Sequence, residues 1–156
     1  DQYLFQTLSA PMFGIGVKVP AYKDFAAKLL YQLAPQVTLW NELTHDYLTR
    51  DAAIISEFEK DALRHDKISS GVYLGSLRAM EFIHSKAKKL TLPTYIQIPE
   101  NDPVNSSERT RSFFENTDHR ICQLKSYPDR KHEMYNDLGR EEVFKDLKEF
   151  IQNKIN

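Results

Sequence analysis

The sequence has little cysteine and no surplus of one charge. Cys122 is the single cysteine among 156 residues, so no disulfide can form within the chain and the fold does not depend on an oxidising compartment. The 21 lysines and arginines nearly balance the 22 aspartates and glutamates, which leaves a net charge of −1. Because nucleic-acid-binding proteins usually carry a basic excess, we do not expect a nucleic acid as a partner.

Long apolar runs, glycine-rich loops and metal-ligand spacings are also missing. No apolar stretch approaches the roughly 18–20 residues of a membrane-spanning helix, so no transmembrane segment is expected. With only 5 glycines, the chain has no phosphate-binding loop. His132-Glu133 resembles the start of the zinc motif H-E-x-x-H, but Asn136 occupies the position of the second histidine. We therefore expect no metal site and no cofactor.

The residues that are present suit a folded domain. Hydrophobic residues make up 41% of the chain and aromatic residues 12%, which is enough for a core at this length. The chain begins Asp1-Gln2-Tyr3-Leu4, without an initiator methionine and at the edge of a stretch that predicts a β-strand. We therefore expect it to be a piece of a longer protein.

Hydrophobic periodicity predicts three strands and five helices. Runs rich in β-branched and aromatic residues predict strands over residues 3–9, 92–98 and 120–127. In a helix over residues 20–33, the apolar residues form one face. Its members are Tyr22, Phe25, Ala26, Leu29, Leu30 and Leu33.

The other helices are predicted to start near residues 49, 69, 106 and 139. Hydroxyl side chains that can cap free amides mark three of these starts. They are Thr49, Ser69 or Ser70, and Ser106 or Ser107. We interpret residues 36–45 as irregular and the charged stretch 57–67 as a solvated helix end and loop.

The order of these elements predicts an α/β fold. Strand–helix–strand units favour parallel pairing, so we expect a sheet of roughly three parallel strands. The insertion between the first two strands is far longer than the dozen residues of a simple crossover, which indicates a helical cap. The expected division is residues 1–16 for sheet core, 17–88 for the cap and 89–156 for the remaining core.

Two polar turns follow neighbouring strands of the predicted sheet. Asp102 lies in the turn after strand 92–98, and His132 in the turn after strand 120–127. Ligands gather at the carboxyl ends of parallel strands, where an Asp can fix the imidazole tautomer so that the ring accepts a proton. The alternative is a structural role, because Asp is common in turns and histidine is common in surface loops.

Six short segments share their order with a known family. They are Leu8–Gly14, Leu48–Asp51, Asp61–Asp66, Ile98–Val104, Tyr127–Glu133 and Arg140–Val143. In this order they resemble the carboxyl-terminal half of an α/β-hydrolase of the monoacylglycerol lipase and lysophospholipase type, sometimes grouped with serine aminopeptidases. The resemblance implies the last three parallel strands of an α/β-hydrolase sheet with a helical cap. It also implies that Asp102 is the triad acid and His132 the general base.

The nucleophile of that family is not in this sequence. No G-x-S-x-G pentapeptide occurs in the 156 residues, so the resemblance implies that the serine lies upstream, in a missing amino-terminal half that would act as a partner. The implied activity is cleavage of lipid-like carboxylic esters, monoacylglycerol or lysophospholipid, with this chain alone inactive. The alternatives are a non-catalytic α/β binding module, or the same fold acting on peptides or small esters.

Apolar residues in the predicted cap and its flanking loops are candidates for contact with an acyl chain. The principal candidates are Met12, Phe13, Trp40 and Tyr47, because they lack an evident helical core role. Ile15, Val17, Val19, Leu39 and Leu43 belong to the same set. The alternative is that these side chains pack the cap onto the sheet.

Overall fold

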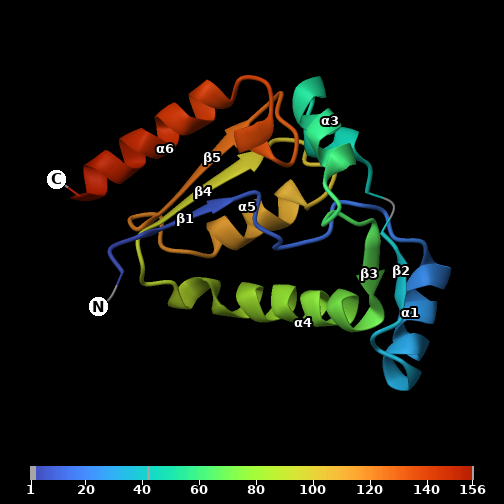
Figure 1. The fold of residues 1–156 in the computed structure, drawn as a ribbon. Coiled ribbons are helices and arrows are strands. Elements are labelled where there is room, and N and C mark those ends of the chain that lie inside the picture. The colour runs from blue at the N-terminus through green and yellow to red at the C-terminus, as the bar shows by residue number, and fades with distance from the viewer. Residues whose placement is uncertain (1–2, 42, 156) are drawn as a thin grey trace.

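A computed structural model describes residues 3–41 and 43–155. The described residues do not include Asp1, Gln2, Glu42 and Asn156. The expectation based on Asp1–Leu4 therefore lies partly outside the described residues. The main sheet has three parallel strands in the order β1-β4-β5 (Figure 1). They are β1 (Gln6–Ser9), β4 (Thr94–Pro99) and β5 (Cys122–Tyr127). The predicted α/β fold with a parallel sheet is confirmed.

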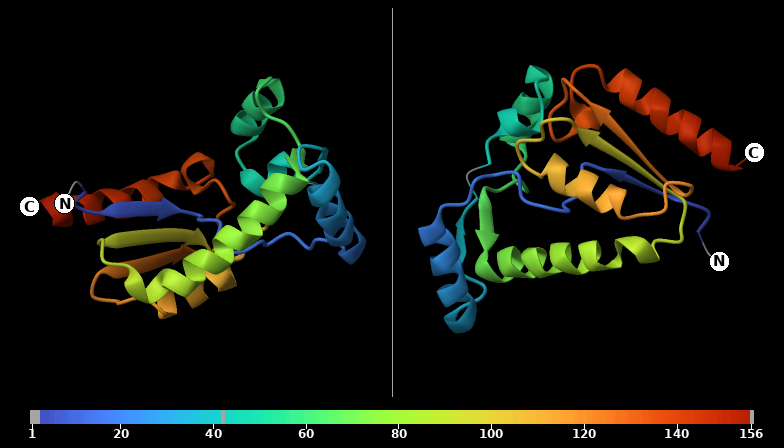
Figure 2. Two further views of the ribbon diagram at one scale, coloured as in Figure 1. Left: turned by 90° about the horizontal axis from the view of Figure 1, so that it is seen from below. Right: turned by 180° about the vertical axis from the view of Figure 1, so that it is seen from behind.

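The central strand β4 is buried on both faces, as a parallel strand covered by helices must be. Ile96 and Ile98 point to the face covered by α4 (Ser70–Lys86) and α5 (Ser107–Glu115), where Phe113 completes a hydrophobic cluster. Alternate residues point to the opposite face, where Tyr95 stacks on Phe150 of α6 (Arg140–Ile155) at 4.9 Å between ring centroids. Figure 2 shows α6 on one side of the sheet and α4 with α5 on the other.

Residues 17–88, here named the cap segment, connect β1 to β4. Their first part lies beyond the carboxyl ends of the strands, and α4 then runs back along the sheet (Figures 1 and 2). Besides α4, the segment contains three helices and two short strands. They are α1 (Ala21–Leu33), β2 (Thr38–Trp40), α2 (His45–Leu48), α3 (Ala52–Lys60) and β3 (Lys67–Ser69). Among the described residues no helix combines the length and apolar character needed to cross a membrane.

Two predictions about the cap segment were wrong. The stretch 36–45 is not irregular throughout, because β2 pairs antiparallel with β3 and α2 begins at His45. Thr49 does not cap the following helix: the Asp51 carboxylate accepts the Ala53 amide at 3.0 Å, and the Thr49 hydroxyl accepts the Asp51 amide instead. A three-residue strand held by a distant partner leaves no periodicity in the sequence.

Two of the predicted hydroxyl caps are confirmed and resolved to one residue each. The Ser69 hydroxyl accepts the Val72 amide at 3.2 Å, at the start of α4. The Ser106 hydroxyl accepts the Arg109 amide at 3.1 Å, at the start of α5. Each hydroxyl therefore satisfies an amide that has no partner within its own helix.

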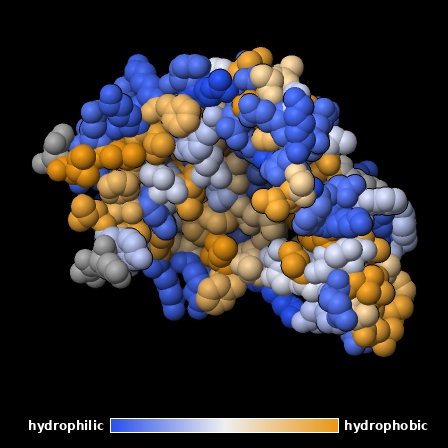
Figure 3. Space-filling view, in the orientation of Figure 1, coloured by the Kyte–Doolittle hydropathy of each residue, from blue (hydrophilic) through white to orange (hydrophobic). Residues whose placement is uncertain are grey.

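Helix α1 is present, but its predicted apolar face does not pack against a core. Phe25 and Leu33 are more than two-thirds exposed, and hydrophobic side chains gather over α1 at the lower right of Figure 3. The helix contacts α4 through a different side, where Ala27 is buried and the Tyr73 hydroxyl donates to Asp24 at 3.1 Å. The covered side carries Asp24 and the small Ala27, so the apolar pattern of the sequence did not indicate which side is covered.

Truncation of the central strand is expected to destabilise the fold strongly. Ile98 is 1% exposed, so Ile98→Ala leaves a cavity and is expected to lower the free energy of unfolding by about 3 kcal/mol. Urea denaturation measures this loss. In the control Leu63→Ala, a side chain that is 89% exposed is removed, and a change within about 0.5 kcal/mol is expected. Equal effects of the two substitutions would contradict the packing described for β4.

Candidate active site

The loop after β4, residues 100–106 and here named the acid loop, is organised around the Asp102 side chain. Oδ1 of Asp102 accepts the amides of Val104 at 2.8 Å and Asn105 at 3.2 Å, as Asp commonly does in turns. The Ser107 hydroxyl donates to the Pro99 carbonyl at 2.7 Å and accepts the Asp102 amide at 3.3 Å. One carboxylate oxygen therefore shapes the loop, and Oδ2 remains available for a second role.

The loop after β1 packs against the acid loop and depends on close backbone approach. The Gly16 amide donates to the Val104 carbonyl at 2.8 Å, and Ile15 pairs with Asn105 in an antiparallel bridge. A Cβ on Gly16 would lie 2.9 Å from the Asn105 carbonyl, so only glycine fits there. The Asn105 amide also donates to the Ala10 carbonyl at 2.8 Å. The loops after β1 and β4 thus meet at the carboxyl ends of these strands.

The loop between β5 and α6, residues 128–139, is here named the histidine loop, and it is bonded to the cap segment. The His132 amide donates to the Tyr47 carbonyl at 3.3 Å, and the Glu133 amide to the Leu48 carbonyl at 2.8 Å. From the sheet, the Tyr135 hydroxyl donates to the buried Gln97 side chain at 2.6 Å. The backbone around His132 is therefore fixed from both the cap segment and the sheet.

Asp102 and His132 form a hydrogen bond. Nδ1 of His132 lies 2.9 Å from Oδ2 of Asp102. Since a carboxylate can only accept, Nδ1 carries the proton, and the neutral ring then presents Nε2 as an acceptor. The Asp102 side chain is 2% exposed, whereas the His132 side chain is 21% exposed. The acid is shielded from water while the imidazole remains accessible to a reacting group.

An apolar cavity lies beside the acid loop, between that loop and helices α1 and α4. Met12 and Trp40 line it, together with Val104 of the acid loop. Five further candidates from the sequence also line it: Ile15, Val17, Val19, Leu39 and Leu43. Val104 and Asn105 of the acid loop line the cavity, whereas Asp102 and His132 do not.

Two of the candidate substrate-binding residues do not line this cavity. Phe13 is 8% exposed and packs on Phe113 of α5 at 4.5 Å between ring centroids, so it belongs to the sheet core. Tyr47 lies on α2, and it contacts the site through its carbonyl, which accepts the His132 amide. An apolar residue in a loop has the same sequence pattern whether it faces a core or a cavity.

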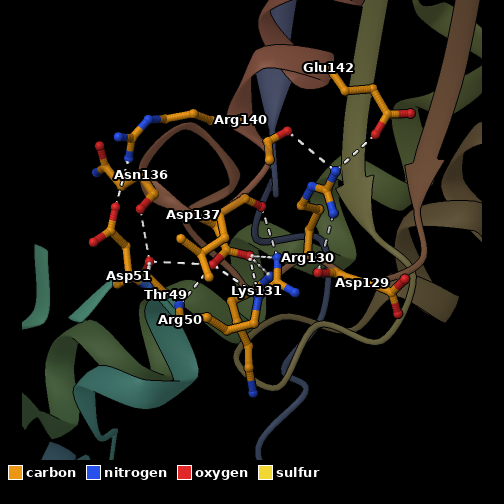
Figure 4. A network of polar contacts seen from close by, with 12 residues as sticks. Thr49, Arg50, Asp51, Asp129, Arg130, Lys131, Asn136, Asp137, Arg140 and Glu142 are labelled. Carbon is orange, nitrogen blue, oxygen red and sulfur yellow. Dashed lines mark hydrogen bonds and ion pairs between the residues drawn. The ribbon is translucent and has the colours of Figure 1, made fainter. Parts of the chain in front are cut away.

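Sequence reasoning missed Asp137, which is fully buried five residues after His132. Its carboxylate accepts the Arg50 amide at 2.7 Å, the Lys131 amide at 2.8 Å and the Arg50 side chain at 3.1 Å (Figure 4). Burial raises the pKa of Asp137, but the hydrogen bonds from Arg50, Lys131 and Leu138 outweigh it, so the pKa lies below its ordinary value. The segment Leu48–Asp51 is one of the six segments that resemble the family, but its sequence does not indicate that Arg50 pairs with Asp137.

No group of three or more possible metal ligands occurs among residues 3–41 and 43–155. Glu133, next to the histidine, is instead engaged by protein side chains. Its carboxylate accepts Arg64 at 3.2 Å and Asn136 at 2.7 Å. The site described here is therefore built from hydrogen-bonded protein groups.

The parallel sheet, its covering helices and the inserted cap segment define the class of the fold, an α/β-hydrolase sheet. The family described as "Serine aminopeptidase, S33" matches residues 5–139, and the chain belongs to this family. The family resemblance found in the sequence is thereby confirmed.

Curated relatives are similar along nearly the whole chain. A phospholipase of Bacillus subtilis, YtpA, is 26% identical over 95% of this chain, and a monoacylglycerol lipase of Mycolicibacterium smegmatis is 24% identical over 99%. An abhydrolase domain-containing protein of Dictyostelium discoideum is 24% identical over 95%. The chain spans 58% and 55% of the two bacterial relatives and 16% of the Dictyostelium protein.

Solved structures show the same fold. The monoacylglycerol lipase of Paleococcus ferrophilus superposes with a TM-score of 0.83 at 24% identity, over 92% of this chain and 56% of that chain. A soluble variant of monoglyceride lipase from Saccharomyces cerevisiae, solved with a substrate analogue, superposes with a TM-score of 0.80 at 17% identity. That match covers 96% of this chain and 56% of the yeast chain.

Removal of the Asp137 charge is expected to flatten the acid side of the stability profile. The lowered pKa means that the carboxylate stabilises the fold above its unfolded-state pKa of about 3.9, and that this stabilisation is lost as pH falls through the folded-state value. Urea denaturation from about pH 3 to 6 should show a shallower decline in Asp137→Asn than in the wild type. Asp61→Asn, at a carboxylate 46% exposed, is the control. An unchanged slope in Asp137→Asn would contradict this account.

Proposed function

We propose that this chain supplies the acid and the general base of a serine hydrolase that cleaves carboxylic esters of monoacylglycerol or lysophospholipid. In this proposal, His132 takes the proton of an attacking serine and returns it to the leaving alcohol. Asp102 holds the imidazole in the reactive tautomer. The observation that carries the proposal is the 2.9 Å hydrogen bond between His132 and the buried Asp102 at the carboxyl ends of adjacent strands.

The cavity and the relatives support the proposed ester substrate. A lining of methionine, tryptophan and aliphatic side chains suits an acyl chain, because each buried methylene contributes ~0.8 kcal/mol of transfer free energy. Two relatives are named as a phospholipase and a monoacylglycerol lipase. We assign Met12 and Trp40 to contact with the acyl chain. We also propose that residues 17–88 cover the active site as a lid.

The nucleophile is proposed to lie in a segment outside this chain. No G-x-S-x-G sequence occurs in the 156 residues, and the two bacterial relatives are nearly twice as long as the matched region. Strand β1 has a neighbour only on its β4 side among the described strands, so its other edge can accept a further strand. The missing half of the sheet and the upstream serine would complete the enzyme there.

A peptidase is the second candidate function, because the matching family is described by a serine aminopeptidase. The same acid and base would serve a peptide or a small ester equally well. The two functions differ in what the cavity binds: an acyl chain requires an apolar wall, whereas a free peptide amino terminus requires acidic partners. The predominantly apolar lining beside Val104 favours the lipid ester. A non-catalytic module is the outcome if no ester or peptide is turned over.

His132→Ala is expected to abolish ester hydrolysis. The test uses the protein expressed together with the residues encoded ahead of Asp1, because the proposal places the nucleophile there. Removal of a triad base costs on the order of 10⁴-fold or more in kcat, and labelling of the serine by a fluorophosphonate should also be lost.

The matched control is His119→Ala, at a half-exposed histidine stacked on Phe114 at the opposite end of β5. It should retain turnover and labelling. Full activity of His132→Ala would refute the assignment of the base.

Obstruction of the cavity is expected to affect long-chain esters selectively. Ser76 lines the cavity from α4, so Ser76→Phe should displace several acyl methylenes and lower kcat/KM for long-chain relative to short-chain esters by about 10- to 100-fold. Ser85→Phe, on the same helix but exposed and away from the cavity, should leave the ratio unchanged. An equal loss for short and long esters in Ser76→Phe would contradict acyl binding in this cavity.

A further inference from the structure

A single buried carboxylate joins the cap segment to the loop that carries the candidate base. Asp137 is 0% exposed and lies just after the short helix η2 (Met134–Asn136). Oδ2 accepts the amide of Lys131, the residue immediately before His132. Oδ1 accepts the Arg50 amide from the cap segment. The carboxylate thus bonds the backbone beside His132 and the backbone of Arg50, which lies 87 residues earlier in the chain.

The Arg50 side chain, which comes from the cap segment, binds both oxygens of Asp137. Nε of Arg50 lies 3.1 Å from both oxygens of Asp137, and Nη2 lies 2.9 Å from Oδ2 (Figure 4). Nη2 also donates to the Leu138 carbonyl at 2.9 Å. Such a forked contact fixes direction as well as distance, which a single point charge does not.

Neighbouring contacts run between the same two segments. The Thr49 hydroxyl donates to the Asn136 carbonyl at 2.8 Å, and Arg140 contacts the Asp51 carboxylate at 3.1 Å (Figure 4). Together with the backbone bonds from His132 and Glu133 to α2, these contacts attach the stretch from His132 to Arg140 to the cap segment at several points. The loop therefore cannot keep its present path if residues 47–51 move away.

We infer that Asp137 is a positioning residue for His132, and that through Arg50 it makes the geometry of the base depend on the position of the cap segment. This inference rests on the proposed function. Asp137 touches no reacting group; it fixes the backbone on the amino side of His132, while Tyr47 and Leu48 of α2 fix it at and after the histidine. With the cap segment in place, the imidazole lies at hydrogen-bond distance from Asp102. Displacement of residues 47–51 removes the contacts that hold it there.

The decisive variant is Asp137→Asn in the protein that includes the residues encoded ahead of Asp1. Asparagine keeps the size of the side chain but replaces one acceptor oxygen with an NH2 donor. This donor would face an N–H of Arg50 or Lys131, so that hydrogen bond would be lost. A misplacement of the base by about 1 Å costs up to about 100-fold, so kcat for an ester should fall about 10- to 100-fold. KM should stay within about twofold, because the acyl cavity is not altered.

The matched control is Asp118→Asn. Asp118 is likewise a carboxylate held by an arginine side chain and a backbone amide, both from Arg120, but it lies at the amino end of β5, away from His132. It should leave kcat and KM unchanged. The low-field NMR signal of the His132 Nδ1 proton supplies a second readout: it should weaken or shift in Asp137→Asn and not in Asp118→Asn.

Arg50→Lys keeps the inference testable if Asp137→Asn fails to fold. Lysine retains the charge beside Asp137 but loses the fork, so kcat should fall about threefold or more with KM unchanged. A kcat in Arg50→Lys or in a folded Asp137→Asn equal to that of Asp118→Asn would overturn the positioning role. If His132→Ala itself kept full turnover, the proposed function would fail instead, so the two failures are distinguishable.

Discussion

The parallel register of β4 and β5 is the constraint on which the candidate site depends. Pro99 lies opposite Tyr127, and the Glu100 amide donates to the Tyr127 carbonyl at 2.8 Å, so the two strands end at the same level. The loops that follow must then leave the sheet side by side, and Asp102 and His132 meet within hydrogen-bond distance. A slip by one residue would turn the side chains of one strand to the opposite face and separate the two loops.

Buried polar groups within the sheet hold this register. The Gln97 side chain donates to the Tyr127 hydroxyl at 2.7 Å and to the Val143 carbonyl at 3.0 Å, and accepts from Tyr135. Burial raises the pKa values of Tyr127 and Tyr135, so both hydroxyls stay neutral donors at ordinary pH. An apolar residue at position 97 could not orient the central strand, the last helix and the histidine loop together, because it has no directional contacts.

The order of strands and helices could be predicted from the sequence better than the long-range contacts could. The strands over residues 94–99 and 122–127 were predicted within a few residues, because short segments with apolar residues that end in polar turns are a local signal. The proximity of Asp102 and His132 follows from that topology alone. By contrast, nothing local connects Asp137 to Arg50 or β2 to β3, since these pairings exist only after the chain has folded. The exposure of one apolar side of α1 is likewise decided by its neighbours and not by its own sequence.

The insertion of the cap segment between two paired strands also affects how the sheet is assembled. Gln6 and Thr94, bonded at 2.9 Å between β1 and β4, are 88 residues apart, whereas the Gln97–Tyr127 contact spans only 30. By loop-closure entropy, the longer connection costs about 1 kcal/mol more to close. Formation of the β4–β5 pair is therefore favoured first, with β1 joining late and after the intervening helices have shortened the effective loop. The two strands whose ends carry Asp102 and His132 thus form the earliest part of the sheet.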